Sequence, residues 1–598
     1  MPKDSLEEKM QADEQTSSQN SDDPIEELPD TPNVAAMPIV GPGEAAAIAV
    51  EEQILEEARE AKPSERRELV KSASLVMLGN LSSSLIGFVR QAAVAASGPA
   101  ISSSFFAALL PAQTFNDFLV NGSVSGALIP TFNDYAAPEK REELRRLVFT
   151  IINLVILIML PAAIAFLFIA PFVTNVLATN FSPEDKVLTA QFAQIIFFSL
   201  LLLGPFAVLQ AALYALKEFG WAAFAATSYH VGIIIGAIAS ALLGTYFFGH
   251  LGLAFGVILG AAGEIALLLP GIRRQKMGYM FILDLQHPAL KRILRLYAPV
   301  ALSFLVSMAL IYFDQHLASS TQCVTAVSGV KNCAEANVTA LRLATTLTQF
   351  PVGLVAAALA FAVLPTLTAH ARENNPEQFK DTLLLGVRLG LLLMIPAAAG
   401  LIVLSGPIVA LLFQHGKHTA QDAALTAIAL RGYAYQLPFI AIDQLCINAF
   451  YARKNTIIPV VVGFVCILGY LAVALPFANT GIGMPALAVA NTVQNSLHGI
   501  ILLVLLRRAI GPMHIRKTVP VVLKILLATA AMVAVAWGLQ LVLGHVALFT
   551  LSKFYGQLLT VVVVGGLAAG VYFGGVMLLK VEEIALLKGA ALAKLGRK

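Results

Sequence analysis

Long hydrophobic runs recur along most of the chain and are its dominant pattern. A helix that crosses a bilayer needs about 20 predominantly apolar residues, and runs of this length recur between residues 74 and 579. Short polar stretches separate them. The pattern predicts about fourteen transmembrane helices, at residues 74–96, 103–132, 147–177, 187–216, 221–243, 251–272, 294–318, 338–370, 383–413, 423–451, 457–477, 486–506, 521–543 and 551–579.

The composition also favours a membrane protein. Of the 598 residues, 57% are hydrophobic and 13% are charged, and the mean hydropathy is +0.76. Soluble domains carry roughly 25% charged residues, so this chain has about half of the charge that a water-facing surface needs. We therefore expect an all-α integral membrane protein.

The N-terminal segment has a different character from the rest of the chain. Residues 1–60 contain 16 acidic and 3 basic residues, a net charge of −13, which leaves +16 for the remainder. The segment is rich in Ser, Gln and Pro and has too few apolar residues to bury a core. We expect residues 1–68 to form an acidic, mostly disordered cytoplasmic tail, either a solvated leader or a segment that binds a partner.

Lysines and arginines concentrate in alternate loops between the predicted helices. One set of loops holds basic groups such as Arg273 with Arg274 and Arg507 with Arg508. The other set holds at most one lysine in each loop. Because basic loops stay on the cytoplasmic side, the alternation predicts that both termini are cytoplasmic.

Two cysteines lie in the short loop after the seventh predicted helix. Cys323 and Cys333 are on the outer side in this topology, and disulfides form in oxidising compartments. The sequence leaves a disulfide and two free thiols as alternatives.

Arginines inside the apolar runs are the most informative positions. A charge at the centre of a bilayer costs about 2.5–3.5 kcal/mol on the insertion scale, so it should face a cavity or a partner. Arg90 and Arg342 lie one in each half of the chain, and guanidinium groups bind phosphate through paired hydrogen bonds. They are candidates for binding an anionic ligand. The alternative is that they pair with carboxylates and only hold helices together.

Further polar residues follow one face of the second predicted helix. Gln113, Asp117 and Asn121 are spaced four residues apart and so share that face, and Asn116 lies beside them. We expect these four to line a cavity. The isolated carboxylates of other helices are candidates for ion or proton coupling, or are neutral and buried; they are Glu264, Asp314 and Asp443.

The motifs of soluble enzymes are missing from the sequence. There is no nucleotide-binding loop, zinc spacing, nucleophile–base arrangement or dinucleotide fingerprint. We therefore expect a transporter rather than an enzyme, with no metal, no cofactor and no nucleic-acid partner. A coupling cation (Na⁺ or H⁺), the membrane potential or the gradient of the substrate itself would drive it.

Several segments resemble one family of bacterial transporters. Residues 85–90, LIGFVR, resemble the LGFxRD motif of the first helix of the MurJ/MviN lipid II flippases. Residues 340–343 with 349–353 resemble that family's ADRL and FPxG motifs, and residues 411–422 resemble its LLFxxGxFTAxD motif. The resemblance runs from about residue 74 to the C-terminus.

This resemblance implies a fold of the multidrug, oligosaccharidyl-lipid and polysaccharide exporter superfamily. Two six-helix lobes, residues 69–275 and 276–510, would surround a central cavity, and residues 511–598 would add two helices that form a groove for a lipid tail. The implied activity is to flip lipid II, an undecaprenyl-diphosphate-linked peptidoglycan precursor, from the inner to the outer leaflet of the bacterial plasma membrane by alternating access. Peptidoglycan biosynthesis, cell-wall biogenesis and cell shape would depend on it, and membrane lipids and cell-wall synthesis proteins are the implied partners.

The resemblance assigns Arg90 and Arg342 to its two motif arginines, and Asp314 to an acidic position of the seventh helix that is sometimes tied to cation binding. Four positions depart from the family by lacking its usual charge: Ser84, Gln91, Asn121 and Leu341. The cavity should therefore be less cationic than is usual. Two alternatives follow: an exporter of another polyprenyl-linked oligosaccharide or an amphipathic small molecule, and a non-transporting scaffold for cell-wall synthesis.

Overall fold

The computed structural model describes residues 63–123, 128–243, 249–372, 375–453, 455, 457–513, 515–549 and 553–584. All of these residues belong to the unit Val34–Lys598. Most of the predicted acidic tail, residues 1–62, lies outside the described residues. Within the described ranges the chain is helical and contains no strand.

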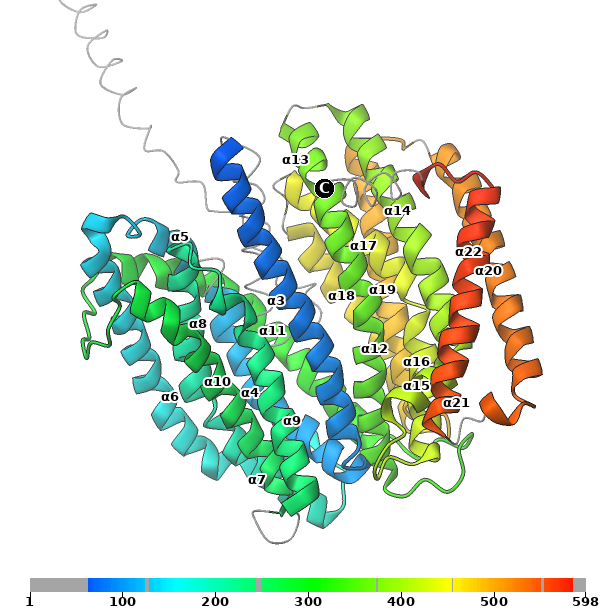
Figure 1. The fold of residues 1–598 in the computed structure, drawn as a ribbon, viewed down its shortest axis with the longest axis horizontal. Helices are drawn as coiled ribbons and strands as arrows, with labels where there is room; N and C mark the ends of the chain where they lie inside the picture. The colour runs from blue at the N-terminus through cyan, green and yellow to red at the C-terminus, as the bar shows by residue number, and fades with distance from the viewer. Residues whose placement is uncertain are drawn as a thin grey trace, which may run out of the picture. The chain divides into compact units, whose positions relative to one another are not determined.

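The first group of helices packs into an N-lobe (Figure 1). Within it, α3 and α10 both pack on α9, and α4 and α6 both pack on α7. Its members are α3 (Pro63–Ala95), α4 (Pro99–Ser123), α5 (Ile129–Asn133), α6 (Arg141–Leu177), α7 (Pro183–Phe197), α8 (Leu200–Ala215), α9 (Ala225–Leu243) and α10 (Gly252–Arg274), with short 3-10 turns at Pro138–Lys140, Trp221–Phe224 and Gly249–Leu251.

The second group forms a C-lobe, to which the last helices are attached through α14. The long helix α11 (Pro288–Ser320) joins the two lobes and contacts α4 and α6 as well as α12. The C-lobe helices are α12 (Cys333–Ala362), α13 (Leu364–Arg372), α14 (Pro376–Val403), α15 (Ser405–Phe413), α16 (Ala420–Ala434), α17 (Leu437–Ala452), α18 (Ile457–Ala478) and α19 (Pro485–Ile510). The attached helices are α20 (Ile515–Leu543), α21 (Phe554–Leu559) and α22 (Gly565–Leu578), with a 3-10 turn at Ala547–Phe549 and a π turn at Thr560–Val564.

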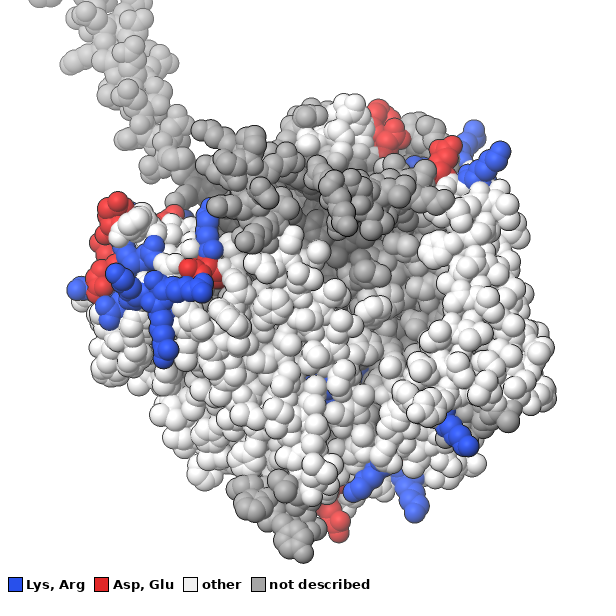
Figure 2. Space-filling view, viewed as in Figure 1, with Lys and Arg blue, Asp and Glu red and all other residues white. Residues whose placement is uncertain are grey.

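Large apolar side chains cover the outside of these helices. Phe168 is 81% exposed and Leu578 is 84% exposed, which an aqueous surface would not favour. Figure 2 shows a broad uncharged surface, with Lys, Arg, Asp and Glu gathered mainly towards two opposite ends. The protein is therefore a multi-pass membrane protein, and the predicted all-α membrane fold is confirmed.

Nine helices in the described residues are long and apolar enough to cross a membrane, or ten when α16 and α17, bent by 44°, count as one span. The predicted number of fourteen stays a prediction. Four long helices are not among them: α3, α4, α11 and α12. Arg90, Asp117, Asp314 and Arg342 lie one on each of these four helices.

Among the predicted spans that the structure divides, three in the C-lobe are each split into two helices at a proline. The predicted helix 338–370 becomes α12 and α13, 383–413 becomes α14 and α15, and 423–451 becomes α16 and α17. In each case the second helix has a proline in its first turn, at Pro365, Pro407 and Pro438. Proline lacks an N–H and is tolerated where a helix begins, so these sites restart a helix rather than continue it.

The buried side chains show where the lobes meet. One apolar core contains residues of both lobes, including Val94, Phe105, Leu343 and Phe413, at the end of the molecule where α3 finishes. Towards the other end the cores are separate, one inside the N-lobe around Phe132 and one inside the C-lobe around Phe450. Among the residues whose side chains the structure describes, the lobes therefore share a core at one end; we call this the shared end.

Candidate functional site

The two arginines predicted to bind an anion lie near each other. Arg90 is on α3 of the N-lobe and Arg342 is on α12 of the C-lobe, and they are close enough to repel each other electrostatically. Nη2 of Arg342 donates a hydrogen bond to Oε1 of Gln113 on α4 (3.2 Å). Asp117, one turn further along α4, attracts Arg342. Helices of both lobes thus bring Arg90, Arg342, Gln113 and Asp117 together; we call these four the arginine cluster.

A carboxylate of α10 lies beside this cluster. Glu264 has no exposed surface and acts electrostatically on Tyr229 of α9, as do Arg90 and Asp117. Glu264, expected among the coupling residues, is therefore a neighbour of the arginine cluster. Sequence reasoning missed Tyr229, because a phenol in an apolar run carries no charge to reveal it.

The remaining polar residues of this region have different surroundings. Asn116 is 1% exposed, and among the described residues neither atom of its amide has a hydrogen-bond partner. The side chain of Asn121 lies outside the described residues. Gln91 donates a hydrogen bond to the hydroxyl of Thr346 on α12 (3.3 Å). Where the resemblance leads us to expect an aspartate, a neutral contact thus joins α3 to α12.

The other two candidate coupling carboxylates lie away from the cluster, in the C-lobe. Asp314 of α11 accepts a hydrogen bond from the hydroxyl of Tyr470 on α18. Asp443 of α17 is 2.6 Å from Nδ1 of His498 on α19. Among the described residues, no group of three or more His, Cys, Asp or Glu side chains could hold a metal ion.

At the shared end, hydrogen bonds tie the lobes to each other. Oγ1 of Thr179, in the connection between α6 and α7, is 3.0 Å from Nδ1 of His316 on α11. The side-chain Nδ2 of Asn180 donates a hydrogen bond to the backbone carbonyl of Ser320 (3.1 Å). We call these four residues, Thr179, Asn180, His316 and Ser320, the latch. It fixes the end of α11 against the N-lobe.

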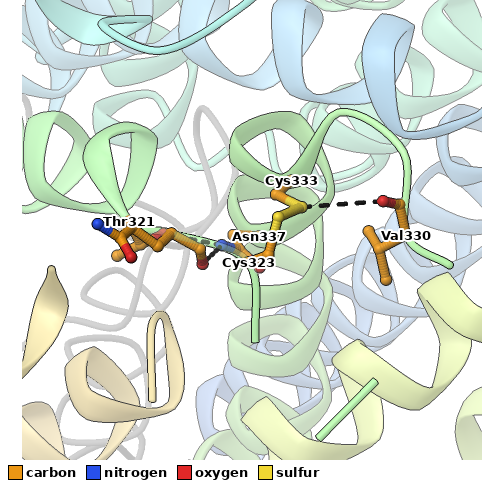
Figure 3. Close-up of a disulfide and its surroundings, with 6 residues drawn as sticks. Thr321, Cys323, Val330, Cys333 and Asn337 are labelled. Carbon is orange, nitrogen blue, oxygen red and sulfur yellow. Dashed lines mark hydrogen bonds between the residues drawn. A yellow bond between two sulfur atoms is a disulfide. The ribbon is translucent and has the colours of Figure 1, made fainter. Parts of the chain in front are cut away.

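A disulfide braces the C-lobe side of the latch. The structure contains a bond between Cys323 and Cys333, which joins the segment after α11 to the first residue of α12. Asn337, one turn into α12, donates a hydrogen bond to the hydroxyl of Thr321 (2.9 Å; Figure 3). The ends of α11 and α12 are therefore held together where both face the N-lobe.

An apolar pocket lies between α14 and the last two long helices. Its volume is about 250 Å³, and its walls include Pro396, Gly400, Met532 and Tyr572. The hydroxyl of Tyr572 donates a hydrogen bond to the carbonyl of Leu392 (2.5 Å), so the phenol has a hydrogen-bond partner within the protein. The pocket suits a hydrocarbon ligand.

The comparison with protein families finds a match over most of the chain. The family model described as "Lipid II flippase MurJ" matches residues 97–557. A protein of Bdellovibrio bacteriovorus named "Probable lipid II flippase MurJ" is 26% identical over 516 residues, which cover 84% of this chain and 95% of the relative. A protein of Rhizobium meliloti with the same name is 25% identical over 485 residues, with coverages of 78% and 87%.

Solved structures show the same fold. A structure described as "Lipid II flippase MurJ, inward closed conformation" matches with a TM-score of 0.65 and 21% identity, covering 84% of this chain and 99% of that chain. An inward-facing multidrug resistance MATE family transporter of the MOP superfamily matches with a TM-score of 0.57 and 16% identity, with coverages of 72% and 94%. The helices are therefore arranged as in this transporter superfamily.

Proposed function

The chain belongs to the lipid II flippase MurJ family, a family of transporters and not of enzymes, and from this membership we propose that it moves lipid II across the bacterial plasma membrane. Lipid II carries a diphosphate in its head group and a long polyprenyl tail. A carrier of this molecule must provide cationic groups within the membrane for the head group and an apolar surface for the tail.

The observation that carries the proposal is the pair of arginines contributed by opposite lobes. Arg90 and Arg342 lie within electrostatic range of each other, and the carboxylate of Asp117 offsets part of their mutual repulsion. Arg342 donates to the neutral amide of Gln113. Phosphate oxygens accept paired hydrogen bonds from guanidinium groups, so a diphosphate between the arginines would relieve the repulsion.

The apolar pocket supports the second requirement. Its walls on α14, α20 and α22 are almost entirely hydrocarbon, so a polyprenyl chain could pass from the surrounding lipid into the pocket without meeting a polar surface, and van der Waals packing would hold it there. We assign to it part of the tail of the lipid. The head group would then be held by the arginine cluster and the tail by the pocket between α14, α20 and α22.

The latch supports alternating access. Given the positive-inside rule, the basic loops such as Arg273–Arg274 face the cytoplasm and the shared end faces outwards. The latched protein would then accept its substrate from the inner leaflet, and opening of the shared end would release it outside. Rocking of two lobes about a central site is how such transporters expose it to each side in turn.

Rescue of growth tests the proposal. Cells depleted of their own lipid II flippase should grow when they express this chain, and Arg342→Ala should lose that rescue because the head group loses its cationic contact. Arg342→Lys, which keeps the charge but not the paired geometry, should rescue in part.

The matched control is Arg431→Ala. Arg431 donates a hydrogen bond to Ser405 within the C-lobe and lies outside the arginine cluster, so its loss should leave rescue intact. Protein abundance is measured by immunoblot for each variant. Full rescue by Arg342→Ala at normal abundance would show that the arginine cluster is not the head-group site.

A second candidate function follows from the neutral Gln91–Thr346 contact. A cavity with fewer charges would suit a related polyprenyl-linked oligosaccharide with a different head group. Proteoliposomes loaded with lipid II distinguish the two, because the second candidate would not translocate it.

A further inference from the structure

A carboxylate and an imidazole meet between two helices of the C-lobe, away from the arginine cluster. Asp443 is on α17 and His498 is near the middle of α19. Nδ1 of His498 is 2.6 Å from Oδ1 of Asp443, and Nε2 is 3.0 Å from the carbonyl oxygen of Pro459 in the first turn of α18. The side chain of His498 is 15% exposed and that of Asp443 is 11% exposed. One imidazole therefore links three helices.

The contact at Nε2 fixes the number of protons that the pair holds. A carbonyl oxygen can only accept a hydrogen bond, so Nε2 of His498 must carry a hydrogen. Nδ1 is then either protonated as well and donates to a carboxylate, or unprotonated and accepts from a carboxylic acid. Both arrangements place one proton between Nδ1 and Oδ1 of Asp443, and both have zero net charge.

Loss of this shared proton would break the contact. A carboxylate oxygen would then face the lone pair of Nδ1, and one uncompensated negative charge would remain within a membrane helix, where it is costly. The helices are packed closely here, since a Cβ at Gly499 of α19 would lie 3.0 Å from the carbonyl oxygen of Phe439 on α17. Separation of Asp443 from His498 therefore requires α17 and α19 to move.

The neighbouring titratable groups do not supply a replacement charge. Cys446 and Tyr451 of α17 and Cys466 of α18 lie within electrostatic range of Asp443. Thiols and phenols are neutral near pH 7. Among the described residues, the cationic group acting on Asp443 is His498 itself.

We propose that Asp443 and His498 form a proton-binding site, which holds α17, α18 and α19 together while the shared proton is bound and releases them when it leaves. α17 also packs against α12, the helix that carries Arg342, so the site is one helix away from the arginine cluster. Binding or release of a proton can thus change how the C-lobe presents that arginine. The site does not depend on which lipid the protein carries.

The test uses the purified full-length protein and the variant Asp443→Asn. The asparagine amide can donate to an unprotonated Nδ1 while Nε2 still donates to Pro459, so the variant keeps both hydrogen bonds but has no shared proton to lose. On an alkaline pH jump followed with an indicator dye, the wild-type protein should release one proton more than the variant. The thermal midpoint of the wild-type protein should also fall as the pH rises, whereas the thermal midpoint of Asp443→Asn should not change over the same pH range.

The matched control is Asn495→Ala, which removes the hydrogen bond from Asn495 to Gln436 (2.6 Å) at the junction of α19 with α17 without removing a titratable group. It should lower the thermal midpoint equally at every pH and release as many protons as wild type. If Asp443→Asn does not fold, the double variant Asp443→Asn/His498→Gln replaces it.

Equal proton release by the wild-type protein and the asparagine variant would overturn the proposal. A midpoint for Asp443→Asn that is lower by the same amount at every pH would also overturn it, because the pair would then be only structural. Neither measurement involves a lipid substrate, so failure here leaves the transport proposal standing.

Discussion

A buried imidazole lies in the loop between α15 and α16, at a position where the MurJ motif resembled by residues 411–422 has phenylalanine. His418 is 3% exposed, and among the described residues neither of its ring nitrogens has a hydrogen-bond partner. Burial lowers the pKa of His418 from its ordinary value, an effect opposed by Asp422 and reinforced by His415. An unpaired buried polar group costs about 1–3 kcal/mol, so this histidine should destabilise the folded state.

We predict that His418→Phe raises the free energy of unfolding by about 1–2 kcal/mol. The free energy of unfolding of this variant should also decrease less than that of the wild-type protein as the pH is lowered. Because the pKa of the folded protein is depressed, the unfolded chain binds the proton more readily. Above its ordinary pKa of about 6.5 the histidine is neutral in both states, and as the pH falls from there towards the lower pKa of the folded protein the unfolded chain binds a proton that the folded protein does not, so stability is lost. Thermal midpoints in detergent at several pH values measure both effects.

His415→Phe is the control for this substitution. Nε2 of His415 donates to the carbonyl of Leu411 (2.8 Å), so its removal takes away a made hydrogen bond and should not stabilise the protein. Parallel pH profiles for the wild-type protein and His418→Phe would contradict the assignment.

Single residues in this protein could be predicted better than their partners. Arg90 and Arg342 could be recognised from the sequence because a charge in an apolar run is costly wherever the run packs. The partners of Asp314 and Asp443 could not, because Tyr470 and His498 lie on other helices and their contacts depend on which faces meet. A histidine inside the apolar run 486–506 was the available signal for the second of these.

At the scale of elements, α9 and α10 are joined by glycines. A Cβ at Gly232 would lie 2.3 Å from the Cα of Gly260, and a Cβ at Gly236 would lie 2.4 Å from the carbonyl oxygen of Gly252. Small residues let membrane helices approach closely where no hydrophobic driving force acts between them. The pair that packs around Glu264 is therefore held by backbone contact.

We predict that Gly232→Ala lowers the free energy of unfolding by about 1–3 kcal/mol, the usual cost of overpacking. Gly570→Ala on α22 is the matched control, since a Cβ there would meet nothing within 4 Å. The control should be neutral or more stable by up to about 1 kcal/mol, because alanine favours a helix over glycine. Thermal midpoints of the two purified variants test this prediction. Equal decreases in the thermal midpoint for both variants would argue against close packing of α9 on α10.

The positions of the helices followed from hydropathy, whereas their interruptions did not. Runs of about 20 apolar residues located the spans because lipid imposes that length. The breaks before Pro365, Pro407 and Pro438 were not predicted, since proline also occurs inside membrane helices, as Pro161 does in α6, where neighbouring groups satisfy the freed carbonyl.

At the scale of the whole molecule, the arrangement of the cores decides which end can open. The lobes share buried side chains only at the shared end, among the residues described. Sequence could not predict which end would be joined, because that depends on which faces of helices far apart in the chain pack together. The contacts that settle it, such as Thr179 with His316, connect residues more than a hundred positions apart.

If transport requires the shared end to open, then a covalent bond across the latch should stop it. The side chains of Thr179 and His316 are in contact, with Oγ1 and Nδ1 3.0 Å apart, so the double variant Thr179→Cys/His316→Cys places two thiols at facing positions, and gel mobility under oxidising conditions measures how much of it forms the disulfide. We predict that this variant fails to rescue flippase-depleted cells under oxidising conditions and regains rescue when a reductant is added. Each single-cysteine variant should rescue in both conditions, and the wild-type protein under reductant controls for opening of the native Cys323–Cys333 bond. Growth supported by the double variant while gel mobility shows it cross-linked would mean that the lipid crosses without separation of the lobes at this end, and alternating access about the arginine cluster would be excluded.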